Sequence, residues 1–192
     1  DFHFTAVSPS GSRRLPEDVR MVRSRDDLGD ASFDHIILAI KPQMIADVLP
    51  AYLRHLAPGG AVFSLAAGLS CDSLRAVAGS SPIVRIMPNL PVAIGQGVSA
   101  LYADAAVGDA QRAAAAALMQ PTGHIVWTAT EDELDRVTAV AGSGPGYAFE
   151  LMRCWTAAAE KLGLEPLTAR ELVLRTLQGA AAMALDDGRT PT

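Results

Sequence analysis

Cysteine is scarce in this 192-residue sequence, which contains only Cys71 and Cys154. The two lie far apart and have no cysteine or histidine partner at metal-ligand spacing, which argues against a disulfide framework and a cysteine-based metal site. A chain with so few thiols is most simply expected in a reducing, cytoplasmic compartment. The histidines are equally scattered, so we predict no metal: they are His3, His35, His55 and His124.

Long hydrophobic runs and excess positive charge are also missing. No uninterrupted run of about 18 apolar residues occurs, and the first residues lack the charged-then-apolar pattern of a secretion signal. The sequence has 16 Lys and Arg residues against 21 Asp and Glu, a formal net charge of −5, so it offers no basic field for nucleic acid. These absences leave a small molecule as the expected partner, with neither a membrane nor a nucleic acid.

What the sequence does contain is enough apolar residues for a sizeable core. With 49% apolar and 19% charged residues, it falls in the range of one large or two small domains. Up to about residue 130, short β-rich segments alternate with amphipathic ones. The predicted strands are residues 2–7, 35–40, 61–66, 83–87, 98–102 and 125–128, and the predicted helices are residues 44–56, 72–78 and 109–119.

Two further features complete this βαβ pattern. The polar stretch between the first two strands is capable of forming a helix, and Pro58-Gly59-Gly60 is expected to end the helix at 44–56. The order of elements predicts an α/β fold with a doubly wound, mainly parallel sheet in residues 1–129.

After residue 130 the pattern contains helices only. Thr130 with Glu133, and Thr168 with Glu171, have the spacing of capping boxes at helix starts. One helix is expected to end at Gly163 and another near Gly188, where a left-handed residue can terminate a helix. Residues 130–192 are therefore predicted to form a second, all-helical domain.

The two parts meet in the segment Val137–Phe149, which reads V-T-A-V-A-G-S-G-P-G-Y-A-F. Gly142 and Gly144 would supply backbone freedom where the chain turns, and Pro145 suits the first position of a new helix because its missing N–H needs no partner there. The segment predicts a fixed joint between two helices. A phosphate-cradling loop is the less favoured alternative, because such loops follow a strand and need free N–H groups.

The joint resembles the signature of the pyrroline-5-carboxylate reductase family, in which a similar S-G-S-G-P-A-Y segment opens the helical domain. Three other segments agree in order and approximate spacing: L-A-I-K-P at 38–42, S-L-A-A-G at 64–68 and R-I-M-P-N-L-P at 85–91. Leu90 departs from the usual Thr, and Gly146 from the usual Ala. The resemblance covers essentially the whole chain. It implies a Rossmann-like dinucleotide-binding domain followed by an all-helical dimerisation and substrate domain, and a homodimer or larger homo-oligomer.

The ligand of an open parallel sheet lies beyond the carboxyl ends of its strands, and three of the matching segments follow predicted strands. Lys41 offers a cation beside a bound dinucleotide, and Ala67 and Gly68 allow the backbone to approach a flat ring. Pro42 is equally a helix-start proline, and Gly68 an ordinary turn glycine. The resemblance and these positions together predict a cofactor cleft formed by Ala39, Ile40, Lys41, Pro42, Leu65, Ala66, Ala67, Gly68, Met87 and Pro88.

The end of the first strand bears on the choice of cofactor. In dinucleotide folds an acid at the end of the second strand binds the ribose 2′-hydroxyl, whereas small hydroxyls and arginines can accept a 2′-phosphate. If the first strand here is the family's second, its end carries no acid, and NADPH is the expected cofactor rather than NADH. The residues concerned are Ser8, Ser10, Arg13 and Arg14, for which a solvated turn is the alternative.

No serine, histidine and carboxylate cluster is suggested by the motifs, and a nicotinamide cofactor would supply the missing reactivity. The resemblance implies NAD(P)H-dependent reduction of L-1-pyrroline-5-carboxylate to L-proline, the last step of proline biosynthesis. It also suggests Glu131 as a substrate-side carboxylate near the ring nitrogen, with Asn89 offering a donor and an acceptor close to the substrate. The alternative for Glu131 is a first-turn acid stabilised by a helix N-terminus.

Two segments of the family pattern are not found in the sequence. They are the Gly-rich strand-turn-helix at the start and the S-P-G-G-T-T-like segment near the end, which would supply the proton donor, so the catalytic residue stays unknown. We therefore keep two alternatives. One is another β-hydroxyacid-dehydrogenase-like reductase, although the only lysine after the joint, Lys161, lies late in its helix. The other is a non-catalytic, truncated binding or oligomerisation module.

Overall fold

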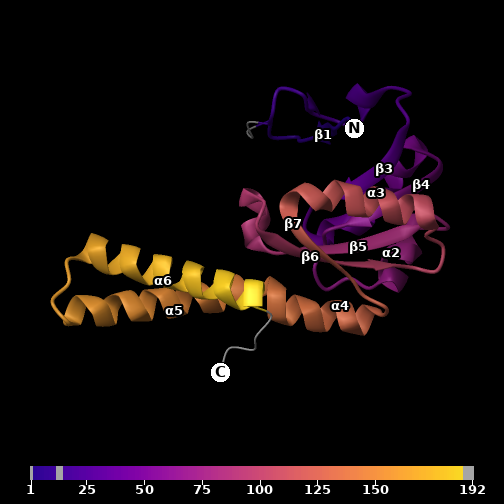
Figure 1. Ribbon diagram of the computed structural model, residues 1–192. Coiled ribbons are helices and arrows are strands. Elements are labelled where there is room, and N and C mark those ends of the chain that lie inside the picture. The colour runs from indigo at the N-terminus through magenta and orange to yellow at the C-terminus, as the bar shows by residue number, and fades with distance from the viewer. Residues whose placement is uncertain (1, 12–14, 188–192) are drawn as a thin grey trace. The chain divides into compact units, whose positions relative to one another are not determined.

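The computed structural model describes residues 2–11 and 15–187 (Figure 1). By its internal contacts the chain divides into two compact units, Asp1–Gly142 and Ser143–Thr192. The sequence placed the domain boundary after residue 129. The structure keeps the next helix with the first unit, because Leu134 of that helix is fully buried there.

The first unit contains two sheets. In the smaller sheet β1 and β2 are parallel, and the larger has the order β3-β4-β5-β6-β7 with parallel neighbours except for the antiparallel pair β5–β6. The predicted α/β class with a mainly parallel sheet is confirmed. The strands are β1 (Thr5–Val7), β2 (Arg20–Val22), β3 (Phe33–Leu38), β4 (Leu56–Ser64), β5 (Ile83–Pro88), β6 (Gly97–Ala103) and β7 (Gly123–Trp127).

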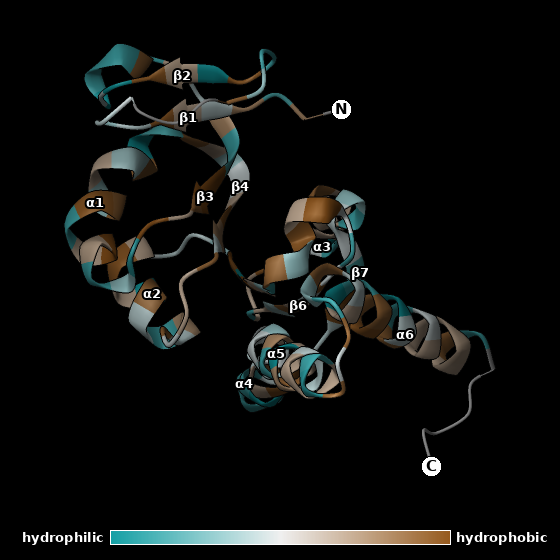
Figure 2. Cartoon of the chain, turned by 90° about the vertical axis from the view of Figure 1, so that its left-hand side faces the viewer, coloured by the Kyte–Doolittle hydropathy of each residue, from teal (hydrophilic) through white to brown (hydrophobic). Residues whose placement is uncertain are grey.

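Helices cover both faces of the larger sheet, with α1 and α2 on one side and α3 on the other (Figure 2). Side chains of one strand therefore point alternately to two cores. In β4, Val62 packs with α1 and α2, whereas Ala61 and Phe63 pack with α3. This double burial explains why the strands read as continuous apolar runs. The helices are α1 (Ile45–Tyr52), α2 (Cys71–Ala78) and α3 (Asp109–Met119).

Two predictions about this unit are wrong. Between β1 and β3 the described residues contain no α-helix but strand β2 and a 3-10 turn at Asp26–Leu28. The Asp27 carboxylate accepts hydrogen bonds from the backbone of Arg23 and Ser24, at 3.1 and 2.8 Å, and so favours a turn over a helix.

The segment Pro58-Gly59-Gly60 does not end a helix either. Strand β4 already begins at Leu56 and runs through it, and the register of β4 against β3 shifts there. Gly60 makes this irregularity fit, because a Cβ on it would lie 2.4 Å from the Asp34 carbonyl oxygen.

A pair of facing glycines fixes the start of β6 and β7. Gly97 is the register partner of Gly123, whose φ is +134°, and a Cβ on Gly123 would lie 2.2 Å from the Gly97 carbonyl oxygen. Replacing Gly123 with alanine is therefore expected to lower the free energy of unfolding by about 2–4 kcal/mol, from backbone strain and overpacking together. Urea unfolding monitored by circular dichroism would measure the loss.

Gly59 offers the matched control, because its φ is +80° but nothing lies within 4 Å of a Cβ placed on it. Its replacement with alanine should cost only the strain of the backbone conformation. Equal losses in the two variants would contradict the role of the Gly97 contact.

The next helices along the chain are α4 (Glu131–Val137), a π-helical turn η6 (Thr138–Gly142), α5 (Gly144–Lys161) and α6 (Pro166–Asp187). Helices α5 and α6 form the described part of the second unit. The Thr130 hydroxyl caps α4 as predicted, accepting from the Glu133 N–H at 3.1 Å. The helix ending near Gly163 is confirmed, with φ of +92° at that glycine. No helix in the described part of the chain is long and apolar enough to cross a membrane.

The predicted capping box of Thr168 and Glu171 is wrong. Helix α6 begins at Pro166, so Thr168 already lies inside its first turn. The cap is Glu165, whose carboxylate accepts from the N–H groups of Leu167 and Thr168 at 2.9 and 3.1 Å. The expected end at Gly188 lies outside the described residues.

Candidate functional site

The loops predicted to hold a cofactor follow three neighbouring parallel strands. Strands β3, β4 and β5 are parallel, so their carboxyl ends lie at one edge of the sheet, which we call the ligand edge. A hydrogen bond of 3.1 Å from the Leu65 N–H to the Leu38 carbonyl joins the first two loops. The ligand edge therefore brings together residues 39–42, 65–68 and 87–89.

The ligand edge carries one cationic side chain, Lys41, and a stretch of backbone that is exposed at Ala67 and Gly68. Lys41 is exposed and forms no ion pair within the described residues, and Pro42 opens the 3-10 turn that follows. Ala67 is exposed, and Gly68 has a φ of +74° with nothing within 4 Å of a Cβ placed on it. Pro42 and Gly68 thus have local roles that are compatible with a cofactor site. Their contact with a cofactor stays a prediction.

The end of β1 forms a tight turn. The Ser8 N–H donates to the Val22 carbonyl at 2.9 Å, and the Gly11 N–H donates to the Ser8 carbonyl at 3.1 Å. Ser8 is half-buried and Ser10 is exposed. Arg13 and Arg14 lie outside the described residues, so their predicted contact with a 2′-phosphate stays a prediction.

A cavity of about 460 Å³ lies between β1 and β3, the facing edges of the two sheets. Its described lining includes the predicted cofactor residues Ala39 and Ile40 and carries no Lys, Arg, Asp or Glu. Among the described strands, β1 pairs only with β2 and β3 only with β4. The cavity therefore suits an apolar group or an extended backbone better than it suits a phosphate.

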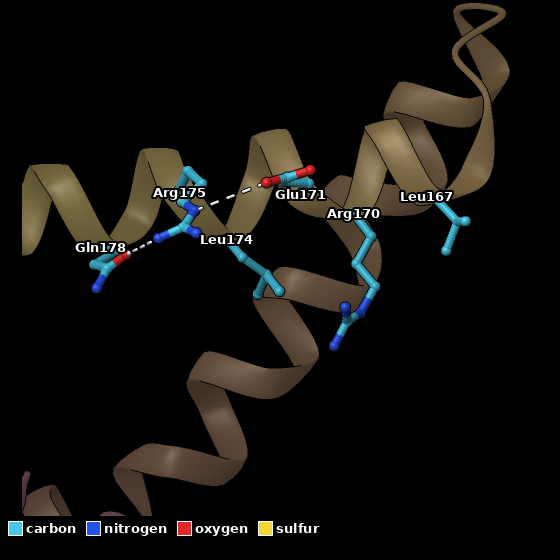
Figure 3. Close-up of a pocket in the computed structure, with 6 residues that line it drawn as sticks. All are labelled: Leu167, Arg170, Glu171, Leu174, Arg175 and Gln178. Carbon is cyan, nitrogen blue, oxygen red and sulfur yellow. Dashed lines mark hydrogen bonds and ion pairs between the residues drawn. The ribbon is translucent and has the colours of Figure 1, made fainter.

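A second hollow, of about 450 Å³, lies on α6. Figure 3 shows the six residues that line it, with Arg175 directed toward Glu171 and Gln178. All six belong to this helix: Leu167, Arg170, Glu171, Leu174, Arg175 and Gln178. Residues of one helix cannot enclose a ligand, so this hollow is not a candidate active site.

The joint is helical rather than a glycine turn. Neither Gly142 nor Gly144 has a positive φ, and Ser143 has helical angles of −83° and −22°. The expectation that these glycines supply special backbone freedom is therefore wrong, whereas Pro145 does lie in the first turn of a new helix as predicted. The π-helical turn η6 leads into this joint.

Pro145 leaves one carbonyl without its helical partner. In an α-helix the Ala141 carbonyl would accept from the N–H four residues later, which is the position of Pro145, and proline has no N–H. The Asn89 side chain supplies the donor instead, through Nδ2 at 3.0 Å. Its Oδ1 accepts from the Val98 N–H at 2.9 Å. Both the nitrogen and the oxygen of the Asn89 carboxamide are thus bonded to backbone groups of the chain. Its contact with substrate stays a prediction.

Glu131 lies in an ion-pair cluster that includes a buried arginine. Its Oε1 accepts from Arg85 Nη1 at 2.6 Å and from the Cys71 N–H at 2.8 Å, and Arg85 Nη2 also contacts Asp135 at 3.3 Å. Partial burial acts to raise the pKa of Glu131, but the hydrogen bonds from Cys71 and Arg85 outweigh it, and the pKa is lowered. Glu131 lies in the first turn of α4, and its substrate role stays a prediction.

The importance of Arg85 was missed at the sequence level, although the residue belongs to one of the matching motifs. Its side chain is only 4% exposed. The available signal was a charged residue inside an otherwise apolar strand, since such residues are rarely buried without a partner. Within the described residues no group of three or more His, Cys, Asp or Glu side chains could hold a metal ion.

Comparisons with known proteins agree with the family resemblance found in the sequence. Residues 131–192 match the family model for pyrroline-5-carboxylate reductase dimerisation. A pyrroline-5-carboxylate reductase of Pseudomonas aeruginosa is 45% identical over 84% of this chain and 59% of its own length. One of Vibrio alginolyticus is 36% identical over 98% of this chain and 71% of its own length.

Solved structures agree with these relatives. The structure of a pyrroline-5-carboxylate reductase from Coxiella burnetii has a TM-score of 0.81 and 33% identity, covering 90% of this chain and 64% of the other. The Plasmodium falciparum pyrroline carboxylate reductase with NADP bound has a TM-score of 0.80 and 25% identity, covering 95% and 72%. The chain spans less than two thirds of the Pseudomonas and Coxiella proteins.

Proposed function

Because the chain belongs to the pyrroline-5-carboxylate reductase family, we propose that the protein carrying it reduces L-1-pyrroline-5-carboxylate to L-proline with NAD(P)H. The observation that carries the proposal is that a loop of the ligand edge is bonded to the start of the joint. The bond from Asn89 to the Ala141 carbonyl ties the start of the joint to the end of β5. The predicted cofactor residues and the Ala141 carbonyl thus lie at the same edge of the sheet.

The residues of the ligand edge fit a dinucleotide. The exposed ammonium of Lys41 would attract its phosphates, and the open backbone at Ala67 and Gly68 would let a flat ring approach. The cofactor, when bound, supplies the hydride that reduces the C=N bond. Ser8, Ser10, Arg13 and Arg14 support NADPH over NADH, because none of them would repel a 2′-phosphate.

We also propose that the protein is a homodimer or larger homo-oligomer. Large apolar side chains of the second unit are exposed, among them Tyr147, Leu162 and Leu167 at 70%, 86% and 75%. An apolar surface of this kind is typical of a protein interface. The match of residues 131–192 to a dimerisation family model supports the same assignment.

The test is a proline-forming assay with NADPH and with NADH, accompanied by direct measurement of cofactor binding. We expect turnover, with a higher kcat/KM for NADPH. Replacing Lys41 with alanine should raise the apparent Kd for the cofactor about tenfold, because one charge-assisted contact to phosphate is lost. Lys161, the only other lysine, gives the matched control and should leave the Kd unchanged.

The same assays separate the alternatives. Cofactor binding without proline formation would overturn the enzyme proposal in favour of a binding module. Reduction of a keto acid in place of the cyclic imine would favour a β-hydroxyacid-dehydrogenase-like enzyme. A clear preference for NADH would defeat the assignment of the serines and arginines after β1.

A further inference from the structure

Strand β5 and the residue that follows it present two polar side chains to one side of the sheet. Successive side chains of a strand alternate between faces, so Arg85 and Asn89, four residues apart, share a face. The backbone at Asn89 is still extended, with φ and ψ of −107° and 171°. At about 3.3 Å per residue, the two positions lie roughly 13 Å apart along the strand.

The segment formed by α4 and η6 runs beside β5 in the same direction. Arg85 contacts Glu131 and Asp135 in α4, and Asn89 contacts Ala141 near the end of η6. Ten residues of helix rise about 15 Å, close to the separation of the two side chains on the strand. One strand therefore holds this helical segment at both ends.

The two ends are held in different ways. At the start, Arg85 carries a full charge and faces two carboxylates, so that contact resists changes in local geometry. At the end, the only described partner of the Asn89 Nδ2 group is the Ala141 carbonyl, which Pro145 has left without an α-helical donor. At this end the contact with the strand is thus a neutral hydrogen bond rather than an ion pair.

We infer that Asn89 is a positioning residue, which holds the start of the joint at the ligand edge through the Ala141 carbonyl. It supplies the donor that the proline removes and so holds the end of η6 beside the end of β5. The consequence for turnover depends on the proposed reductase function, whereas the consequence for the order of η6 does not. Direct contact of Asn89 with substrate or cofactor is not needed.

Hydrogen exchange measured by mass spectrometry tests the inference on the chain as it stands. Replacing Asn89 with aspartate keeps an oxygen for the Val98 N–H but removes the donor to Ala141. We expect the amides of residues 138–142 to exchange about tenfold faster, while the Val98 amide stays protected. Replacing Asn89 with alanine should speed exchange both at residues 138–142 and at the Val98 amide.

Gln96 supplies the matched control, since it is an exposed carboxamide in the loop between β5 and β6. Its replacement with alanine should leave exchange at both sites unchanged. Unaltered exchange at residues 138–142 in the aspartate variant, or an equal increase in the control, would overturn the inference.

Kinetics provide a second readout that structural damage alone would not give. If the reductase function holds, N89D should lower kcat about tenfold and leave the Kd for NADPH within about twofold. A parallel loss of cofactor affinity would mean that Asn89 touches the cofactor directly, which contradicts the positioning role. If the wild-type protein forms no proline, the exchange experiment still decides the role of Asn89.

Discussion

Replacing Arg85 with methionine is expected to lower the free energy of unfolding by about 3–5 kcal/mol. The guanidinium is 4% exposed and lies between Glu131 and Asp135, at 2.6 and 3.3 Å. Methionine would fill much of the space but leave the half-buried Glu131 carboxylate without its counter-charge. Chemical unfolding of the two proteins at pH 7 would measure the difference.

Arg136 provides the control, since it lies in α4 with the two carboxylates that Arg85 contacts. It pairs with Asp132 at the same distance of 2.6 Å, but the two side chains are 71% and 80% exposed. Solvent screens such a pair, so replacing Arg136 with methionine should cost less than about 1 kcal/mol. Equal losses at Arg85 and Arg136 would contradict the importance of burial.

Changing pH adds an independent test of the same cluster. The pKa of Glu131 is lower in the folded protein than its ordinary value of 4.5, so its ionised form stabilises the fold above that value. This contribution disappears as the pH falls through the folded-state pKa. The stability difference between wild type and E131Q should therefore shrink on acidification, and a difference that is the same at pH 7 and pH 3 would refute the assignment.

Cys71 is expected to react with iodoacetamide about 1000-fold more slowly in the native protein than an ordinary thiol at pH 8. Burial first, and then the negative charges of Glu131 and Asp104, raise its pKa from 9.0 to about 12. A pKa that is higher by about three lowers the fraction of reactive thiolate at pH 8 about a thousandfold. Mass spectrometry of peptides after timed labelling would follow the reaction.

The unfolded protein gives the reference, because Cys71 and Cys154 should label at similar rates once the fold is lost. E131Q removes one of the negative charges beside the thiol and should speed native labelling of Cys71. Native labelling at the unfolded rate would show that the thiol is neither buried nor electrostatically suppressed.

Much of the sheet could be predicted because its signals are local. Continuous apolar runs marked β3, β4 and β5, and the alanine-rich stretch at 109–119 became α3 with the same bounds. The resemblance to the reductase family, based on four short motifs, is also confirmed. Two of the failures come from side-chain hydrogen bonds that periodicity does not reveal. The Asp27 carboxylate binds backbone N–H groups that a helix would use, and Glu165 caps α6 ahead of Thr168, the predicted cap.

The candidate site was predictable to a smaller extent. Loops after parallel strands can be located from the order of elements alone, so residues at the ligand edge could be named. The partners of Arg85 are 46 and 50 residues away along the chain, and Ala141, the acceptor for Asn89, is 52 residues away. No local pattern specifies such distant contacts, so the sequence did not predict the bonds of Glu131 to Arg85 and of Asn89 to Ala141.

The reversed direction of β6 and β7 determines where the chain leaves the sheet. Trp127, the last residue of β7, is paired with Leu101, which is itself paired with Ile86 in the middle of β5. The chain thus leaves β7 opposite the middle of β5. The segment formed by α4 and η6 then runs along β5 from Arg85 to Asn89. If all five strands of the larger sheet ran in the same direction, the chain would have completed β7 at the ligand edge. Because β6 and β7 are both reversed, the segment that follows them runs back along β5 and ends beside Asn89 at the ligand edge.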